Sequence, residues 1–346
     1  MDWLPKNSNT LRQSDKKPKM KYTSFLLLIF VAFSCGTWRK VNLDEFIERS
    51  NCYQQEIYAY SSDDLPVPLY MLSLDTLLTN NFYFNSLNIA HAFGFLEDIA
   101  KFTELVEQTA PSEEQNLAKK LEILQLRQRI NNAIQMASIE VSAVASEMDC
   151  EEERADQIAS YLSRKEGKSE KRLTVSAIVS GAFGTILSAF IVLNDPDDNN
   201  VEYVGVLTGL TEVIFGSLLL TNERKVQFNH ERNALRDLWE GRTISSIFPP
   251  PIWYYLNYYD PNLPEEDSKR NLILEKWMKF GQITASRDKK KNKLIELYFM
   301  DGGYYTAQQL ENRANMHDQV ESQINLIKQN LKTLASELDS FVNNKI

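Results

Sequence analysis

The chain has 346 residues, of which 43% are hydrophobic and 25% charged, a balance typical of a folded protein. Six Lys or Arg and two acidic side chains lie in the first 35 residues, so the rest of the chain carries a formal net charge of −13. Because phosphate backbones repel so acidic a body, we expect no nucleic-acid partner. With only 12 glycines and 11 prolines, long stretches lack helix breakers. We therefore predict an all-α fold, in which long coiled-coil-like helices form a bundle with an apolar helical hairpin.

The N-terminus has the layout of a secretory signal. An apolar run, Phe25–Phe33, follows a basic stretch and is shorter than the roughly 20 residues needed to span a bilayer. Its length suits the apolar region of a signal peptide, about 7–15 residues. We interpret residues 1–35 as a signal peptide that starts at Met1 or at Met20.

The end of this run, Ala32-Phe33-Ser34-Cys35-Gly36, resembles the lipobox of bacterial lipoproteins. Small residues precede the cysteine at positions −3 and −1, whereas Phe33 at −2 departs from the pattern. The resemblance covers residues 20–36 and implies that Cys35 is lipidated and becomes the mature N-terminus. Gly36, in place of an inner-membrane retention Asp, implies the outer membrane. We expect a lipid-anchored protein of the bacterial cell envelope; an uncleaved anchor or a plain signal peptide is the alternative.

Two further cysteines lie in the body of the chain, Cys52 and Cys150. In an oxidising compartment they either form one disulfide that closes a long loop or remain buried thiols. The spacing alone does not decide between these two states.

The body divides into three predicted regions. Residues 36–111 form an N-terminal helical region, with helices expected at Asp44–Tyr60 and Phe82–Gln108. Residues 112–242 form a long helical hairpin with an apolar tip at 173–221, and residues 243–346 form a C-terminal helical region. The aromatic cluster at 253–259 is expected to be a loop packed on the core.

Two segments have coiled-coil periodicity. From Ile130 to Leu162 apolar residues recur at alternating spacings of three and four, with one interruption at Glu151. The coiled coil at 306–343 begins with a capping box of Thr306 and Gln309, after a turn at 301–303. We expect the two segments to pair within the chain. The alternative is pairing with another copy or with an envelope protein.

The tip, residues 173–221, is the most informative segment. Leu173–Leu193 holds 21 residues without a charge, and after a polar turn Val201–Thr221 has only Glu202 and Glu212 charged. As a helix each arm measures about 30 Å, the thickness of the hydrocarbon core of a bilayer. This pattern predicts a helical hairpin that inserts into a membrane or spans it.

Small residues recur along faces of both arms. Such faces let helix backbones approach closely inside a membrane, although tightly packed soluble helices use them too. We expect these glycines, together with Glu212, to carry the function of the hairpin. The glycines are Gly181 and Gly184 in the first arm and Gly205, Gly209 and Gly216 in the second.

Two features oppose a simple transmembrane interpretation. A charge at Glu212, near the middle of its arm, costs roughly 2.5–3.5 kcal/mol on insertion scales. Basic residues flank the hairpin, whereas basic flanks normally stay cytoplasmic. Three arrangements resolve this conflict. The hairpin is buried in a soluble bundle, it inserts into another membrane after export, or the body is cytoplasmic and the signal peptide is misassigned.

The second arrangement has a parallel in a known family. Long helices that flank an apolar hairpin, over residues 113–346, resemble in layout the α-helical pore-forming toxins of the cytolysin A type. That resemblance implies an apolar element that is hidden in the soluble form and enters a target bilayer. No sequence motif supports it, and a lipid anchor is a departure from a diffusible toxin.

Signatures of catalysis and metal binding are missing from the sequence. His91, His230 and His317 have no metal-ligand spacing, and there is no HExxH, CxxC, G-x-S-x-G or phosphate loop. We therefore expect a non-enzymatic envelope lipoprotein without metal or cofactor, whose hairpin acts on a lipid bilayer. The alternative is a structural or partner-binding lipoprotein in which the hairpin is buried as core.

Overall fold

A computed structural model describes residues 52, 58–108, 113–194, 200–220, 223–230, 232–262, 267–283 and 288–343. All of them belong to one compact unit, Phe46–Ile346. The predicted signal peptide, Cys35 and most of the helix expected at Asp44–Tyr60 lie outside the described residues. The last three residues of that expected helix, 58–60, are described and are not helical, so its predicted C-terminal end was wrong.

The fold is all-α, as predicted, and it begins with short helices. These are η1 (Ser62–Asp64), η2 (Leu69–Met71), α3 (Thr76–Asn81), α4 (Phe84–Ala92) and α5 (Leu96–Glu107). The single helix predicted over Phe82–Gln108 is therefore wrong in detail. It is broken at Gly94, whose φ of +76° turns the chain between α4 and α5.

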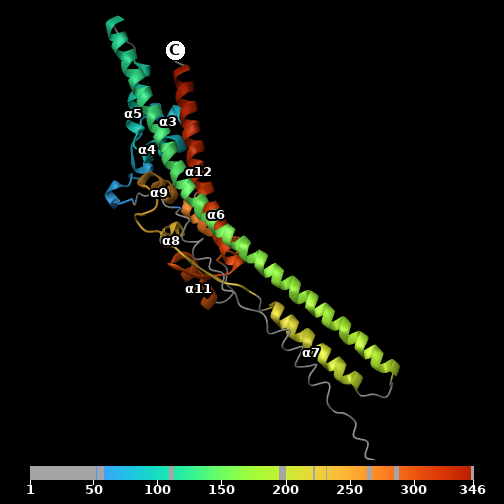
Figure 1. Ribbon diagram of the computed structural model, residues 1–346. Coiled ribbons are helices and arrows are strands. Elements are labelled where there is room, and N and C mark those ends of the chain that lie inside the picture. The colour runs from blue at the N-terminus through green and yellow to red at the C-terminus, as the bar shows by residue number, and fades with distance from the viewer. Residues whose placement is uncertain are drawn as a thin grey trace, which may run out of the picture. The chain divides into compact units, whose positions relative to one another are not determined.

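One continuous helix, α6 (Glu113–Asn194), then runs for 82 residues, which corresponds to about 120 Å. The sequence allows this length because the helix contains no proline. α7 (Asn200–Leu220) returns along the last part of α6 and forms the apolar hairpin, defined here as residues 173–193 of α6 together with α7. Figure 1 shows α7 beside that end of α6.

The C-terminal helix α12 (Ala307–Asn343) packs along the earlier part of α6. The two helices are antiparallel, since Arg127 of α6 pairs with Asp339 near the end of α12 at 2.6 Å. Every apolar position of the C-terminal heptad is buried, and Val320, Ile324 and Ile327 are fully covered. The two heptad segments thus pair within the chain. The predicted capping box is also present, since Thr306 N–H donates to Gln309 Oε1 at 2.9 Å and Gln309 N–H donates to Thr306 Oγ1 at 3.3 Å.

A small sheet was not predicted from the sequence. β1 (Val226–Asn229) pairs with β2 (Gly302–Tyr305) in antiparallel register, with Phe228 opposite Gly303. The segment predicted as a turn at 301–303 therefore opens a strand. Gly302 has a φ of +94°, and a Cβ there would collide with the carbonyl oxygen of Phe228, so this close pairing needs glycine.

Four helices complete the body: α8 (Ala234–Glu240), α9 (Pro250–Asn257), α10 (Lys269–Lys279) and α11 (Asp288–Phe299). The aromatic cluster predicted as a loop lies mostly in α9. Trp253, Tyr254 and Tyr255 are buried there, so the expected packing on the core is right while the loop conformation is wrong. Pro250 at the first helical turn explains the difference, because proline is well suited to start a helix.

A disulfide joins Cys52 to Cys150 in the middle of α6, with their Cα atoms 5.5 Å apart. Of the two states left open by the sequence, the structure has the disulfide. The bridge closes a loop with a sequence separation of 98 residues, which includes the short helices α3, α4 and α5.

Replacing both cysteines by serine is expected to lower the free energy of unfolding by about 3–5 kcal/mol, because the unfolded chain regains the freedom of a loop of this length. Urea unfolding followed by circular dichroism measures this loss. Reducing the wild-type protein should give the same decrease, and a decrease under 1 kcal/mol in both experiments would contradict it.

Candidate functional site

The outer faces of the apolar hairpin are exposed. In each arm only 6% of the most apolar 18-residue window is buried, although both windows are long and apolar enough to cross a membrane. Phe183, Ile186 and Val213 are 70%, 66% and 70% exposed. Large apolar side chains therefore cover the outside of the hairpin and are not covered by the described part of the chain.

The seam between the two arms holds small and hydroxyl-bearing side chains around one buried aromatic ring, Phe215. On α6, Gly184 is buried, and Ser176, Ser180 and Ser188, which recur every four residues with it, are among the half-buried positions. Across the seam, the hydroxyls of Ser180 and Thr211 lie 3.2 Å apart and share a hydrogen bond. The arrangement is the reverse of that in a water-soluble helical pair, which buries apolar side chains and exposes polar ones.

Of the five glycines in the hairpin, those on α6 lie against the opposite arm and those on α7 do not. A Cβ at Gly184 would overlap the side chain of Thr208, and one at Gly181 would lie 3.3 Å from Glu212 Oε1. By contrast, a Cβ at Gly205, Gly209 or Gly216 would meet nothing within 4 Å. These three glycines do share a face, but α7 turns its Thr208, Thr211 and Phe215 side toward α6. The glycine face points about a quarter turn away from that contact, which spacing along one arm could not reveal.

Glu212 lies on the flank of the hairpin and is exposed. Because Gly181 lacks a side chain, the opposing helix leaves space for the Glu212 carboxylate. Within the described ranges, no basic side chain forms an ion pair with Glu212.

Basic residues gather at the base of the hairpin, where both arms meet the body. There the backbone N–H of Arg224 donates to Glu166 Oε1 at 2.7 Å and so ties the end of the returning arm to α6. The basic residues at this base are Arg164, Lys165, Lys168, Lys171, Arg172, Arg224 and Lys225. The turn at the other end, residues 194–200, is acidic in sequence.

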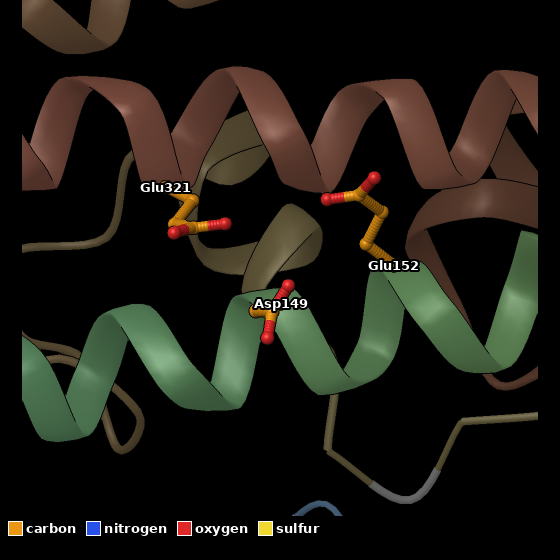
Figure 2. A group of neighbouring side chains, drawn as sticks. All are labelled: Asp149, Glu152 and Glu321. Atoms are coloured by element: carbon orange, nitrogen blue, oxygen red, sulfur yellow. The ribbon is translucent and has the colours of Figure 1, made fainter.

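Figure 2 shows a second charged feature, in which Asp149 and Glu152 of α6 face Glu321 of α12. One oxygen from each carboxylate lies within 4.8 Å of the others. Burial, reinforced by Asp318, Glu321, Asp149 and Asp156, raises the pKa of Glu152 to about 7. Three carboxylates at this separation have the chemistry to hold a divalent cation. The sequence offered no such signal, because the residues come from two distant helices.

The chain matches no known protein family, and neither curated proteins nor solved structures include a significant match to it. Function is therefore inferred from the hairpin and the body that carries it.

Gly184→Val is expected to push the arms apart, because the new side chain collides with Thr208, whose hydroxyl is held by the carbonyls of Val204 and Gly205. Gly209→Val is a matched control, since it makes the same change at a position with open space. Spin labels at Ile178 and Leu210 should report a longer inter-arm distance for Gly184→Val only. Equal distances in both variants would show that the seam does not depend on Gly184.

Proposed function

We propose that the chain is a lipid-anchored protein of the bacterial cell envelope whose apolar hairpin inserts into a lipid bilayer. The observation that carries this proposal is the reversed polarity of the hairpin, with most of its large apolar side chains outside and hydroxyls, Gly181 and Gly184 in the seam beside Phe215. In hydrocarbon, helices associate through small residues and hydrogen bonds because lipid already satisfies their apolar faces.

The free energies favour insertion over exposure to water. Burying one large aliphatic or aromatic side chain contributes about 1.5–3 kcal/mol. Phe183, Ile186, Phe190, Tyr203, Val206 and Val213 are each more than 60% exposed, so several such contributions are gained together. This gain exceeds the roughly 2.5–3.5 kcal/mol that a charged Glu212 costs in a bilayer.

The geometry of the hairpin also suits a bilayer. Each arm has 21 residues in helical conformation, about 30 Å, so all but the terminal backbone groups are paired internally across the hydrocarbon core. The basic residues at the base of the hairpin would lie among anionic headgroups on the membrane face nearest the body. The acidic turn would cross the bilayer to the opposite face. Insertion after export fits these charges, because the charge rule for the inner membrane does not govern it.

The lipid anchor in this proposal rests on the resemblance at Ala32–Gly36, which predicts lipidation of Cys35. A protein that is attached at Cys35 and also inserts its hairpin would contact membranes at two points. We propose a non-enzymatic role on this basis, in which the protein bridges or perturbs a bilayer.

The rival proposal is a structural or partner-binding lipoprotein. Because the outer faces of the hairpin are exposed in this chain, that alternative requires another protein to cover them. The two proposals differ in what the apolar faces meet, which is lipid in the first and protein in the second.

The substitution Ile186→Asp tests whether the outer face of the hairpin is needed for membrane insertion and not for folding of the body. Ile186 is 66% exposed, so the change should leave thermal unfolding of the body within about 0.5 kcal/mol while it abolishes partition into vesicles. Ile139→Asp is the matched control, since Ile139 is 60% exposed on α6 outside the hairpin. Flotation with vesicles measures the partition. Equal flotation of both variants and the wild type would contradict insertion.

Alkaline carbonate extraction of membranes from cells that express Cys35→Ser tests the two attachments separately. This variant removes the predicted lipid site and leaves the hairpin intact. Retention in the membrane pellet is the result expected for an inserted hairpin. Release as folded protein would favour the partner-binding alternative, with the lipid as the sole anchor.

A further inference from the structure

Both chain segments that lead into the apolar hairpin pass through one buried polar cluster. Arg154 of α6 precedes the outgoing arm, and β1 follows the returning arm. The Arg154 guanidinium lies 4.3 Å from the ring centroid of Phe228, and its Nη2 donates to the carbonyl of Asn229 at 3.3 Å. Arg154 therefore joins the segment that precedes the outgoing arm to the strand that follows the returning arm.

α12 completes the cluster from the opposite side. Arg313 is fully buried, and its Nη1 donates to the carbonyl of Tyr298 at 3.0 Å. His317, one helical turn later, is 1% exposed, and neither ring nitrogen has a hydrogen-bond partner among the described residues. His230, which follows β1, is 4% exposed; its Nε2 lies 2.7 Å from the Tyr305 hydroxyl, and its Nδ1 lacks a partner in the same residues.

The cluster holds excess positive charge even when both histidines are neutral. Among the described residues, Arg154 and Arg313 face one carboxylate, Glu151, whose Oε2 is 3.1 Å from Arg154 Nη2. The neighbouring Arg232 is already paired with Glu147 at 3.0 Å. Each protonation of a histidine therefore adds a buried positive charge beside two arginines, with no further carboxylate among the described residues to receive it.

Protonation of these two histidines lowers the stability of the folded chain. Burial, reinforced by Arg313 and Arg154, lowers the pKa of both His230 and His317 well below the usual value. The unfolded chain then binds more protons than the folded one below about pH 6.5, so this contribution to stability is present above that pH and is lost on acidification.

A group of carboxylates on the other side of the α6–α12 contact changes the stability with pH in the direction opposite to that of the two histidines. Burial and mutual repulsion raise the pKa of Glu152 to about 7 and raise that of Glu321 as well, with Lys328 weakly opposing the latter. Their contribution is full at low pH and is lost as the pH rises through these raised values, so they stabilise the contact on mild acidification. The other members of this group are Asp149, Asp156 and Asp318.

We propose that protonation of His230 and His317 opens the base of the hairpin, so that an acidic medium releases α6 and β1 from α12 and promotes insertion. This inference rests on the proposed function, since it supplies the regulation of the same hairpin. At this cluster Arg154 of the outgoing segment, His230 of the returning segment and His317 of the C-terminal helix lie close enough to interact electrostatically.

The first measurement is urea unfolding of the purified Cys35→Ser protein, without vesicles, between pH 7.5 and pH 5. Each additional proton bound by the unfolded state raises the unfolding constant tenfold per pH unit, so two histidines give up to about 100-fold per unit below pH 6. The variants for comparison are His317→Leu, His230→Gln and the double variant, and the double variant should lose most of this dependence. Glu152→Gln isolates the opposing carboxylates.

His91→Gln is the matched control, because His91 is only half-buried and its Nε2 lies 2.6 Å from the Val67 carbonyl, away from the cluster. It should keep the wild-type pH dependence. The wild-type profile needs no substitution, so the inference stays testable even if a variant does not fold. Because the carboxylates oppose the histidines, a profile between pH 6.5 and pH 5 that is flat in both the wild type and Glu152→Gln would overturn it.

The second measurement follows insertion directly. An environment-sensitive fluorophore on Ile186→Cys, in the Cys35→Ser background, is mixed with vesicles of phosphatidylcholine and phosphatidylglycerol at pH 7.5 and pH 5. We expect a fluorescence increase at pH 5 that the double histidine variant lacks, although that variant keeps the acidic turn and Glu212. An equal increase at both pH values would overturn the regulation and leave the proposed function standing. No increase at either pH would overturn the proposed function and, with it, this inference.

Discussion

The apolar seam between α6 and α12 is the interaction on which the rest of the described structure depends. Its side chains, such as Val141, Val320 and Ile324, are fully buried, and they hold together two helices whose heptads lie far apart in the sequence. α6 extends beyond this seam, and its last part packs on α7, as the contacts at Ser180 and Gly184 show. There the polarity of the helix surface is reversed, because apolar residues turn outward and serines line the contact. One uninterrupted helix therefore has a first part that buries its apolar side chains and a last part that exposes them.

The fold class and the pairing of the long helices could be predicted because both depend on periodicity, which is local to each segment. The strands β1 and β2 could not, since each has only four residues and pairs across more than seventy intervening positions. The break at Gly94 was missed for a different reason, because an isolated glycine within an apolar run is compatible with a continuous helix. The disulfide could not be predicted from the sequence, because it depends on where folding places Cys52 relative to Cys150 of α6.

The hairpin was predictable in extent, and its contact surfaces were predictable only in part. Composition located both arms, and small residues recur on two neighbouring faces of the first arm, so the sequence did not decide which of them meets α7. The rotation of α7 about its own axis depends on the partner helix, so spacing could not show that the glycines of that arm lie away from α6. The buried arginines and histidines had no sequence signal at all. Arg154, His230 and His317 come from three separate segments and share no spacing.

The disulfide at Cys150 limits how far the base of the hairpin can lie from Cys35. It attaches the N-terminal segment to the middle of α6, so the tether from Cys35 ends at Cys52 and spans at most about 60 Å when fully extended. From Cys150 to Leu173 the helix covers a further 35 Å or so. For a chain held by lipid at Cys35, the hairpin base then operates within about 95 Å of the anchoring membrane, whether it turns back to that membrane or faces an opposing one. Reduction of the bridge would move the attachment point from Cys52 to the region of Tyr58, whose backbone N–H donates to the carbonyl of Ser246, and would lengthen the tether by about 20 Å at full extension.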